Sequence, residues 1–450
     1  MAVAASVFSG SALFWLTWQR FSLLKHSPPT GASPSNPTEK ILHLAIEEKI
    51  RLIGYSPASS ITFYRGPAPT EHLRSRVKGI LTCNPYLTLR LKKPKRFSSE
   101  ILAVYDDTHP DIHRVSEHFE VVKDASMTHD IPFTDLMRRV DKYQTKVGKK
   151  CINRNEVIFK VTLITIRDNF YAIVVSLNHM IGDGYTFYKL SSMLSTTVTP
   201  YSLDALRNQH FKVEVERLLC PHFLSLLKNP LVAIGFLYNT IVYSPLKPYV
   251  CVVNKSFVES EKSSYNQKTI CAVNMDSVPT SSPFVSTNDI LMSWYVRFSK
   301  CTYAGMVVNF RNRLKGYTDT MAGNYTRSVM YCAKDIQSPG DVRESLQHMD
   351  APYPHQRVGG RSSPNTISDV LSLLTLNFAG ATSWASFYED VTLPDSEVIL
   401  HLPVMSLANM GCRSALIIFK CNSKDTAIVY WGTNNPIDLV NEPIICRLLM

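Results

Sequence analysis

The chain has 450 residues, of which 45% are hydrophobic and 19% charged, a composition that is typical of globular proteins and excludes a largely disordered chain. This length suggests two or three domains, or two closely packed halves. The net charge of +11 suggests either an anionic partner, such as a phosphorylated cofactor or a membrane surface, or a solvated basic surface. Nucleic acid is disfavoured because no basic–aromatic array or zinc-finger spacing accompanies the charge.

The amino-terminal segment, residues 1–26, is hydrophobic. Residues 2–19 are uncharged, and the first charged side chain is Arg20. Such a stretch is at the short limit for a membrane span, and the positive charge that follows it would keep the rest of the chain in the cytosol. We therefore predict membrane association with the body facing the cytosol. A docked surface helix is one alternative, and a targeting segment, which would leave a cytoplasmic or organellar protein, is another.

Residues 27–38 are rich in Pro and Ser and predict a linker. Residues 39–53 then have apolar side chains at an amphipathic spacing, so we expect a helix there. A second apolar stretch, residues 231–243, is shorter than a typical membrane span. A buried crossover helix is favoured for it over a surface that dips into a membrane.

The middle of the chain contains a pattern that indicates a possible catalytic site. Residues 157–166 and 170–177 are rich in β-branched residues and predict a hairpin whose second strand is buried. That strand runs into His179 and Asp183, and the apolar residues after them predict a helix that packs against the sheet. A histidine at a strand end can abstract a proton near neutral pH, although from these residues alone a core histidine beside a turn is the commoner explanation.

Gly182 and Gly184 flank Asp183. They allow a close approach of the backbone and positive φ angles in this loop.

Metal ligands are not predicted. His109 and His113 share an i,i+4 spacing and His118 is close by, but Pro110 interrupts the helical face. The ten cysteines form no C-x-x-C pair, so a zinc site and a redox dithiol are also not expected.

The segment LNHMIGDGYTFYKL (177–190) resembles the H-x-x-x-D-G motif of the BAHD acyltransferases, which belong to the chloramphenicol acetyltransferase-like superfamily. Four further segments resemble that family in the expected order, and Ser286 to Asp289 in one of them would cap a helix. These segments are LRSRVKGILTCNPYLTLRL (73–91), STNDILMSWYVRF (286–298), VVNFRNRLKGYTDTMAGNY (307–325) and ATSWASFYEDV (381–391).

The resemblance implies an α/β fold with two chloramphenicol acetyltransferase-like domains, in which mixed β-sheets are flanked by helices and a channel runs between the domains. We expect an N-terminal domain with the motif over 39–205, a crossover over 206–265 and a C-terminal domain over 266–450. It further implies a monomer with a role in secondary metabolism.

The resemblance also implies the chemistry. The protein would move an acyl group from acyl-CoA, a co-substrate and not a bound cofactor, to a hydroxyl or amine of a small, lipophilic acceptor, with His179 as general base. Asp183 would be structural and paired with Arg311, with Arg313 as the fallback. Thr382 and Trp384 would lie near the developing oxyanion, for which their O–H and N–H groups are suitable donors.

Two departures from the family pattern leave alternatives open. The late D-F-G-W-G motif is absent, which indicates a divergent branch and leaves the residues that hold coenzyme A unknown. Asn178 replaces the first histidine of the H-H-x-x-x-D-G form, which argues against condensation domains and wax ester synthases. A non-catalytic binding protein on the same fold and a carrier-protein-dependent amide synthase are the alternatives.

Overall fold

The structure is a computed structural model. It describes residues 39–50, 54–93, 100–106, 112–219, 230–243, 245–273, 284–347, 377–407, 411–433 and 436–450. The predicted hydrophobic segment 1–26 and linker 27–38 lie outside these residues, as does His109.

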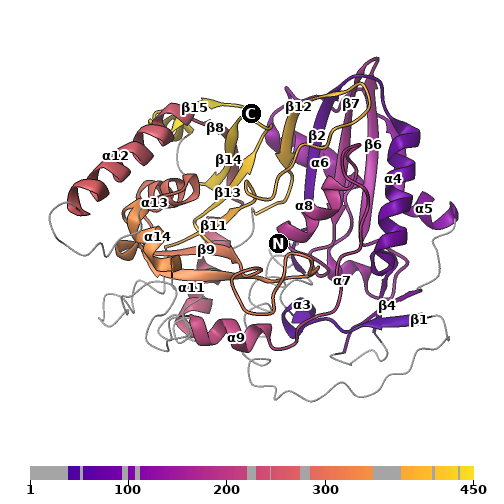
Figure 1. Cartoon of the computed structure of the whole chain (residues 1–450), viewed down its shortest axis with the longest axis horizontal. Coiled ribbons are helices and arrows are strands. Elements are labelled where there is room, and N and C mark those ends of the chain that lie inside the picture. Colours follow the sequence, from indigo (N-terminus) through magenta and orange to yellow (C-terminus); the bar gives the residue numbers. More distant parts are fainter. Residues whose placement is uncertain are drawn as a thin grey trace.

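Two large β-sheets organise the described residues, each within its own layered body (Figure 1). The N-terminal body contains a five-stranded sheet in the order β12 (Glu397–Pro403), β2 (Ala58–Arg65), β7 (Phe170–Leu177), β6 (Phe159–Arg167) and β5 (Phe119–Lys123). The C-terminal body contains a seven-stranded sheet in the order β10 (Thr326–Cys332), β9 (Tyr303–Asn309), β11 (Phe378–Ser383), β13 (Ser414–Lys420), β14 (Thr426–Gly432), β8 (Lys247–Val253) and β15 (Ile445–Leu448).

Helices cover these sheets. The N-terminal body carries α3 (Ile46–Ile50), α4 (Thr70–Cys83), α5 (Ile112–His118), α6 (Phe133–Val140), α7 (Gly148–Cys151) and α8 (Gly184–Ser192). The C-terminal body carries α9 (Phe211–Leu218), α11 (Pro230–Val242), α12 (Lys255–Val273), α13 (Thr287–Ser299), α14 (Pro339–Gln347) and α16 (Pro436–Val440). In Figure 1, α4 and α5 lie on the outer side of the five-stranded sheet, whereas α8 lies on the side that faces the C-terminal body.

The predicted hairpin is present as β6 and β7, and every residue of β7 is buried. Its turn contains Asn169 at φ 54°, a left-handed conformation that Asn adopts more readily than most residues. The predicted helix cap is also present. The Ser286 side chain accepts from the backbone N–H of Asp289, whose carboxylate accepts in return from the backbone N–H of Ser286.

The helix predicted over residues 39–53 is wrong for its first part. Residues Glu39–Leu42 form strand β1, which pairs antiparallel with β4 (Leu102–Asp106) in a small sheet that β3 (Arg90–Lys92) completes. Strand pairing with a segment some sixty residues away overrides the local helical spacing. Only α3 retains the expected helix.

Helix α11 corresponds to the apolar stretch 231–243 and is only half-buried. Val232 packs on the β9–β10 edge of the sheet, whereas Ile234 and Ile241 are exposed. The helix therefore buries one face, as the favoured crossover helix would, and leaves the other face exposed. Among the described residues, no helix has the length and apolarity to span a membrane.

Two strands cross the predicted domain boundaries. Strand β8, within residues 206–265, belongs to the seven-stranded sheet, and β12, within residues 266–450, pairs with β2 in the five-stranded sheet. Figure 1 shows β12 lying beside β2, among strands from the first half of the chain. The two bodies are therefore joined by an exchanged strand.

Candidate active site

The loop between β7 and α8 carries the H-x-x-x-D-G motif to the side of the N-terminal body that faces the C-terminal body. Asn178 anchors its beginning. The Asn178 backbone N–H donates to the carbonyl oxygen of Ile158 at 2.7 Å, and its side chain donates to the carbonyl oxygen of Lys146 at 2.8 Å and accepts from the backbone N–H of Met180 at 3.0 Å. The residue in the place of a first histidine thus shapes the turn that presents His179.

His179 is partly exposed, but its Nδ1 is buried and has no hydrogen-bond partner among the described residues. The ring of Tyr55 meets the imidazole edge to face, with centroids 5.8 Å apart. Burial lowers the pKa of His179, while its own backbone, the charge of Asp183 and the side chain of Asn324 raise it. The lowered pKa keeps the imidazole neutral at neutral pH, which is the form that can accept a proton.

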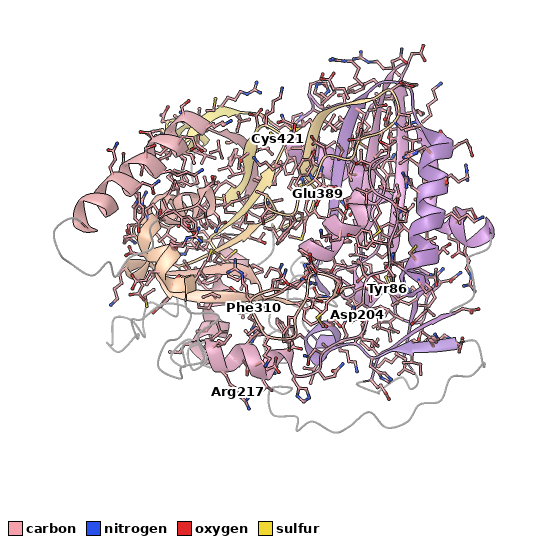
Figure 2. All side chains as sticks on the ribbon, viewed as in Figure 1. Tyr86, Asp204, Arg217, Phe310, Glu389 and Cys421 are labelled. Carbon is pink, nitrogen blue, oxygen red and sulfur yellow. The ribbon has the colours of Figure 1, made fainter. Side chains whose placement is uncertain are left out.

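Asp183 and Arg311 form a buried ion pair that links the two bodies. Arg311 Nη1 lies 2.9 Å from Asp183 Oδ2, and both side chains are almost completely buried. Asp183 Oδ1 also caps α8 by accepting from the backbone N–H of Thr186 at 3.0 Å. Figure 2 shows Phe310, the residue before Arg311, where the two bodies meet.

The remaining donors of Arg311 are also used. Nε donates to the carbonyl oxygen of Met321 at 2.8 Å, and Nη2 donates to that of Gly323 at 2.9 Å. The guanidinium stacks over the rings of Tyr185 and Tyr325. Arg313, in contrast, is exposed, so Arg311 and not Arg313 pairs with Asp183.

The two loop glycines are needed for space and not for their backbone angles. A Cβ at Gly182 would lie 2.8 Å from the side chains of Leu177 and Thr186, and one at Gly184 would lie 2.9 Å from Nε1 of Trp384. Neither glycine has a positive φ, so of the two features that glycine allows here, the loop uses only the close approach. The N-cap position of Asp183, with an extended backbone, makes the turn without left-handed residues.

Thr382 and Trp384 lie at the end of β11 toward the motif. The Trp384 ring packs against Phe187 and Tyr188 of α8, and its backbone N–H donates to the carbonyl oxygen of Ile418 at 2.7 Å. Thr382 pairs in register with Val307 of β9. Because register partners share a sheet face and Val307 is 38% exposed, the face that carries Thr382 is open to solvent.

Three residues of this site could not be predicted from their local pattern. Glu48 of α3 and Arg207 form a second buried ion pair, with Arg207 Nε 3.0 Å from a Glu48 carboxylate oxygen. The side-chain amide of Asn324 donates to Glu48 and to the carbonyl oxygen of His179, each at 3.0 Å. Asn324 follows Gly323 within the segment 307–325, and the resemblance of that segment to the family was the only sequence signal for it.

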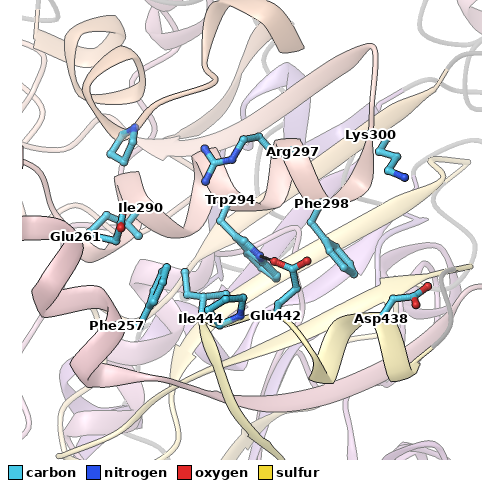
Figure 3. Close-up of a pocket in the computed structure, with 12 residues that line it drawn as sticks. Phe257, Glu261, Ile290, Trp294, Arg297, Phe298, Lys300, Asp438, Glu442 and Ile444 are labelled. Atoms are coloured by element: carbon cyan, nitrogen blue, oxygen red, sulfur yellow. Dashed lines mark hydrogen bonds between the residues drawn. The ribbon is translucent and has the colours of Figure 1, made fainter.

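A separate cavity of about 490 Å³ lies within the C-terminal body. Its lining comes from α12, α13 and the chain around α16, and Figure 3 shows Trp294 and Glu442 joined across it by a hydrogen bond of 3.0 Å. None of the predicted site residues lines it, so it is distinct from the motif.

Metal-ligand clusters are not found among the described residues. His118 is buried in the N-terminal body, where its Nδ1 contacts the carbonyl oxygen of Phe159 at 2.7 Å. That contact accounts for His118 as a structural residue.

No protein-family model matches the sequence, and no curated protein matches it. Solved structures share its fold at low identity. The F. sporotrichioides TRI101 structure, complexed with coenzyme A and T-2, is 13% identical, with 91% of this chain and 100% of that chain covered and a TM-score of 0.56. Vinorine synthase is 12% identical over 92% of this chain and 94% of that chain, with a TM-score of 0.52.

The first condensation domain of the CDA synthetase is also similar. It is 9% identical over 89% of this chain and 93% of that chain, with a TM-score of 0.53. The predicted fold class is thereby confirmed: the chain has an α/β fold with two sheet-containing bodies, which it shares with TRI101, vinorine synthase and this condensation domain.

Proposed function

We propose that the protein transfers an acyl group from a coenzyme A thioester to a hydroxyl or amine of a small, lipophilic acceptor, with His179 as the general base. The observation that carries this proposal is the placement of His179. It is a neutral, partly exposed imidazole on a loop that is braced from the C-terminal body through the Asp183–Arg311 pair. A reacting base held between two bodies can meet two substrates that approach from different sides.

In the proposed reaction, Nε2 of His179 takes the proton of the acceptor hydroxyl or amine. The acceptor atom then forms a bond to the thioester carbonyl carbon, and the carbonyl oxygen becomes an oxyanion. Collapse of this intermediate breaks the carbon–sulfur bond, and the imidazolium returns the proton to the leaving thiolate. The products are an ester or amide and free coenzyme A, and a positioned base contributes about 10²–10⁴-fold to the rate of such a step.

Asp183 and Arg311 contact each other and the loop backbone, so we assign them a structural role and not a chemical one. Thr382 is proposed as an oxyanion donor because it lies on the open sheet face. Trp384 is proposed to hold the beginning of α8 against β11, since its indole nitrogen lies against Gly184. The similarity to TRI101, whose structure was determined with coenzyme A, supports acyl-CoA as the donor.

The test is transfer activity with acyl-CoAs of several chain lengths against a panel of alcohols and amines, read as thiol release together with ester or amide formation. His179→Ala should lower kcat by about 10²–10⁴-fold. His210→Ala, which changes an exposed histidine, is the matched control and should leave the rate unchanged. Full activity in His179→Ala at neutral pH would exclude the general-base role.

The likeness to a condensation domain favours one alternative donor, a pantetheinyl thioester on a carrier protein. The same panel therefore includes an acylated carrier protein. Turnover with that donor and none with acyl-CoA would replace coenzyme A in the proposal. Absence of both turnover and calorimetric binding with every donor would favour a non-catalytic binding protein.

A further inference from the structure

The second buried ion pair also contacts the motif loop, at a different residue from Arg311: Arg207 bonds to Ile181, whereas Arg311 bonds to Asp183. Arg207 Nε donates to both carboxylate oxygens of Glu48 at 3.0 Å, and each side chain is 1% exposed. The backbone N–H of Ala45 also donates to Glu48, at 2.9 Å. Removing two charges from water is costly, so a pair this deeply buried near a reacting group suggests a role in holding that group in place.

Both members of this pair are connected to the motif loop by hydrogen bonds. Arg207 Nη2 donates to the carbonyl oxygen of Ile181 at 2.8 Å. Glu48 accepts from the side-chain amide of Asn324, and the same amide nitrogen donates to the carbonyl oxygens of His179 and Met180 at 3.0 and 3.3 Å. One side chain, that of Asn324, therefore connects the pair to the backbone of the proposed base.

These contacts determine which way the Asn324 amide points. Carboxylate and carbonyl oxygens can only accept hydrogen bonds, so the amide nitrogen must face Glu48 and the loop. The amide oxygen, Oδ1, is then left buried without a hydrogen-bond partner among the described residues, and the same is true of Nδ1 of His179. Two buried atoms without partners, one an acceptor and one able to donate, are unfavourable unless they pair during the reaction.

We propose that Glu48 is a positioning residue that acts through Asn324: it turns Oδ1 of Asn324 toward His179, where that oxygen accepts the Nδ1–H and leaves Nε2 unprotonated for the acceptor. This inference rests on the proposed function. A histidine that acts as a base needs a fixed tautomer and a fixed ring orientation. In this proposal the Glu48 carboxylate fixes the orientation of the Asn324 amide, and that amide fixes the tautomer and orientation of the His179 imidazole.

The groups around the ring determine how its titration should respond. Burial lowers the pKa of His179, whereas its own backbone, the charge of Asp183, the Asn324 side chain and the charge of Glu48 raise it. Asp183 is paired with Arg311, and Glu48 is paired with Arg207. The ring of Tyr55 makes an edge contact with the imidazole. Loss of Glu48 or Asn324 should therefore lower the pKa of His179 further.

The experiment compares Glu48→Gln and Asn324→Ala with the wild-type chain and with Glu47→Gln, the same change one residue earlier in α3. In both test variants, kcat should fall about 10²-fold, the effect typical of a misplaced catalytic group, while the KM for acyl-CoA stays within about twofold of wild type. The acid limb of the kcat/KM profile should move to lower pH. Glu47→Gln should match wild type in all three measurements.

Nitrogen-15 histidine NMR gives a readout that does not depend on turnover, with His179→Ala identifying the resonance. We expect the Nδ1–H tautomer of His179 in the wild type and a mixture or the Nε2–H tautomer in Asn324→Ala. If the wild type transfers acyl groups and both test variants retain its kcat, acid limb and tautomer, the inference is wrong. If the wild type transfers none, the proposed function fails instead, and an unchanged tautomer would still refute the positioning role.

Discussion

The two bodies contribute to the site in different ways. The N-terminal body supplies His179, the histidine proposed as the base, on a loop that follows a fully buried strand. The C-terminal body supplies groups that grip that loop: Arg311, Asn324 and Trp384 contact Asp183, the His179 backbone and α8. His179 and the residues that hold its loop thus belong to different bodies, so the proposed site depends on the relative position of the two bodies.

Substitution of Arg311 is the strongest test of whether the C-terminal body holds the motif loop in place. Arg311→Met should lower the free energy of unfolding by about 3–5 kcal/mol, because it leaves the carboxylate of Asp183 buried without its charge partner. The measurement is urea denaturation followed by fluorescence. Arg313→Met, at an exposed position two residues later, is the control and should change the stability by less than about 0.5 kcal/mol.

The double variant Asp183→Asn with Arg311→Met should recover part of the lost stability, since no charge is then left unpaired. A loss below about 1 kcal/mol in Arg311→Met would mean that the pair does not hold the bodies together.

Thr382 tests the chemical contribution of the C-terminal body. Thr382→Val should lower kcat about 10²-fold, as loss of one oxyanion donor does, with little change in the unfolding midpoint. Ser383→Ala is the matched control, because it removes a hydroxyl from the next residue of β11, which points to the opposite face. Equal effects of the two substitutions on kcat would remove Thr382 from the proposed site.

Acid should destabilise the N-terminal body, in which two further histidines are buried. Burial lowers the pKa of His118 to about 4 and that of His401 to about 3, against about 6.5 in an unfolded chain. Below pH 6.5 the unfolded chain binds protons that the folded chain does not, so stability is fully present above that pH and declines as the pH falls toward 4 and 3.

The expected loss between pH 7 and pH 5.5 is roughly 1 kcal/mol for each histidine. Thermal or urea unfolding across this range measures it, and His118→Gln and His401→Gln should each flatten the slope. The exposed His210 provides the comparison, since His210→Gln should leave the slope as it is. An unchanged slope in both buried-site variants would show that these histidines are not the acid-sensitive groups.

Much of the N-terminal half could be predicted because its signals are local. The β-branched runs, the turn at Asn169 and the helix after Gly184 all follow from periodicity and turn chemistry over a few residues. The Asp183–Arg311 pair came from the family resemblance, because no local rule links residues that are 128 positions apart.

The features that could not be predicted depend on contacts between distant segments. Residues 39–42 have a helical spacing but form a strand because β4 offers a partner. Glu48 lies in an ordinary-looking short helix, and only the folded chain brings it to Arg207 and Asn324. The reason for the loop glycines is of the same kind: side chains from other segments leave no room for a Cβ there, whereas neither glycine has a positive φ.

Strand β12 has a consequence for how the protein is made. It pairs with β2 along residues 60–65, and His401 within it bonds to Thr62 and Tyr188 of the N-terminal body. During synthesis, the edge of β2 must therefore wait for some 330 further residues before its partner emerges. An unpaired edge strand invites association with other chains, so the first half of this chain, produced alone, should be an aggregation-prone fragment and not an independent module.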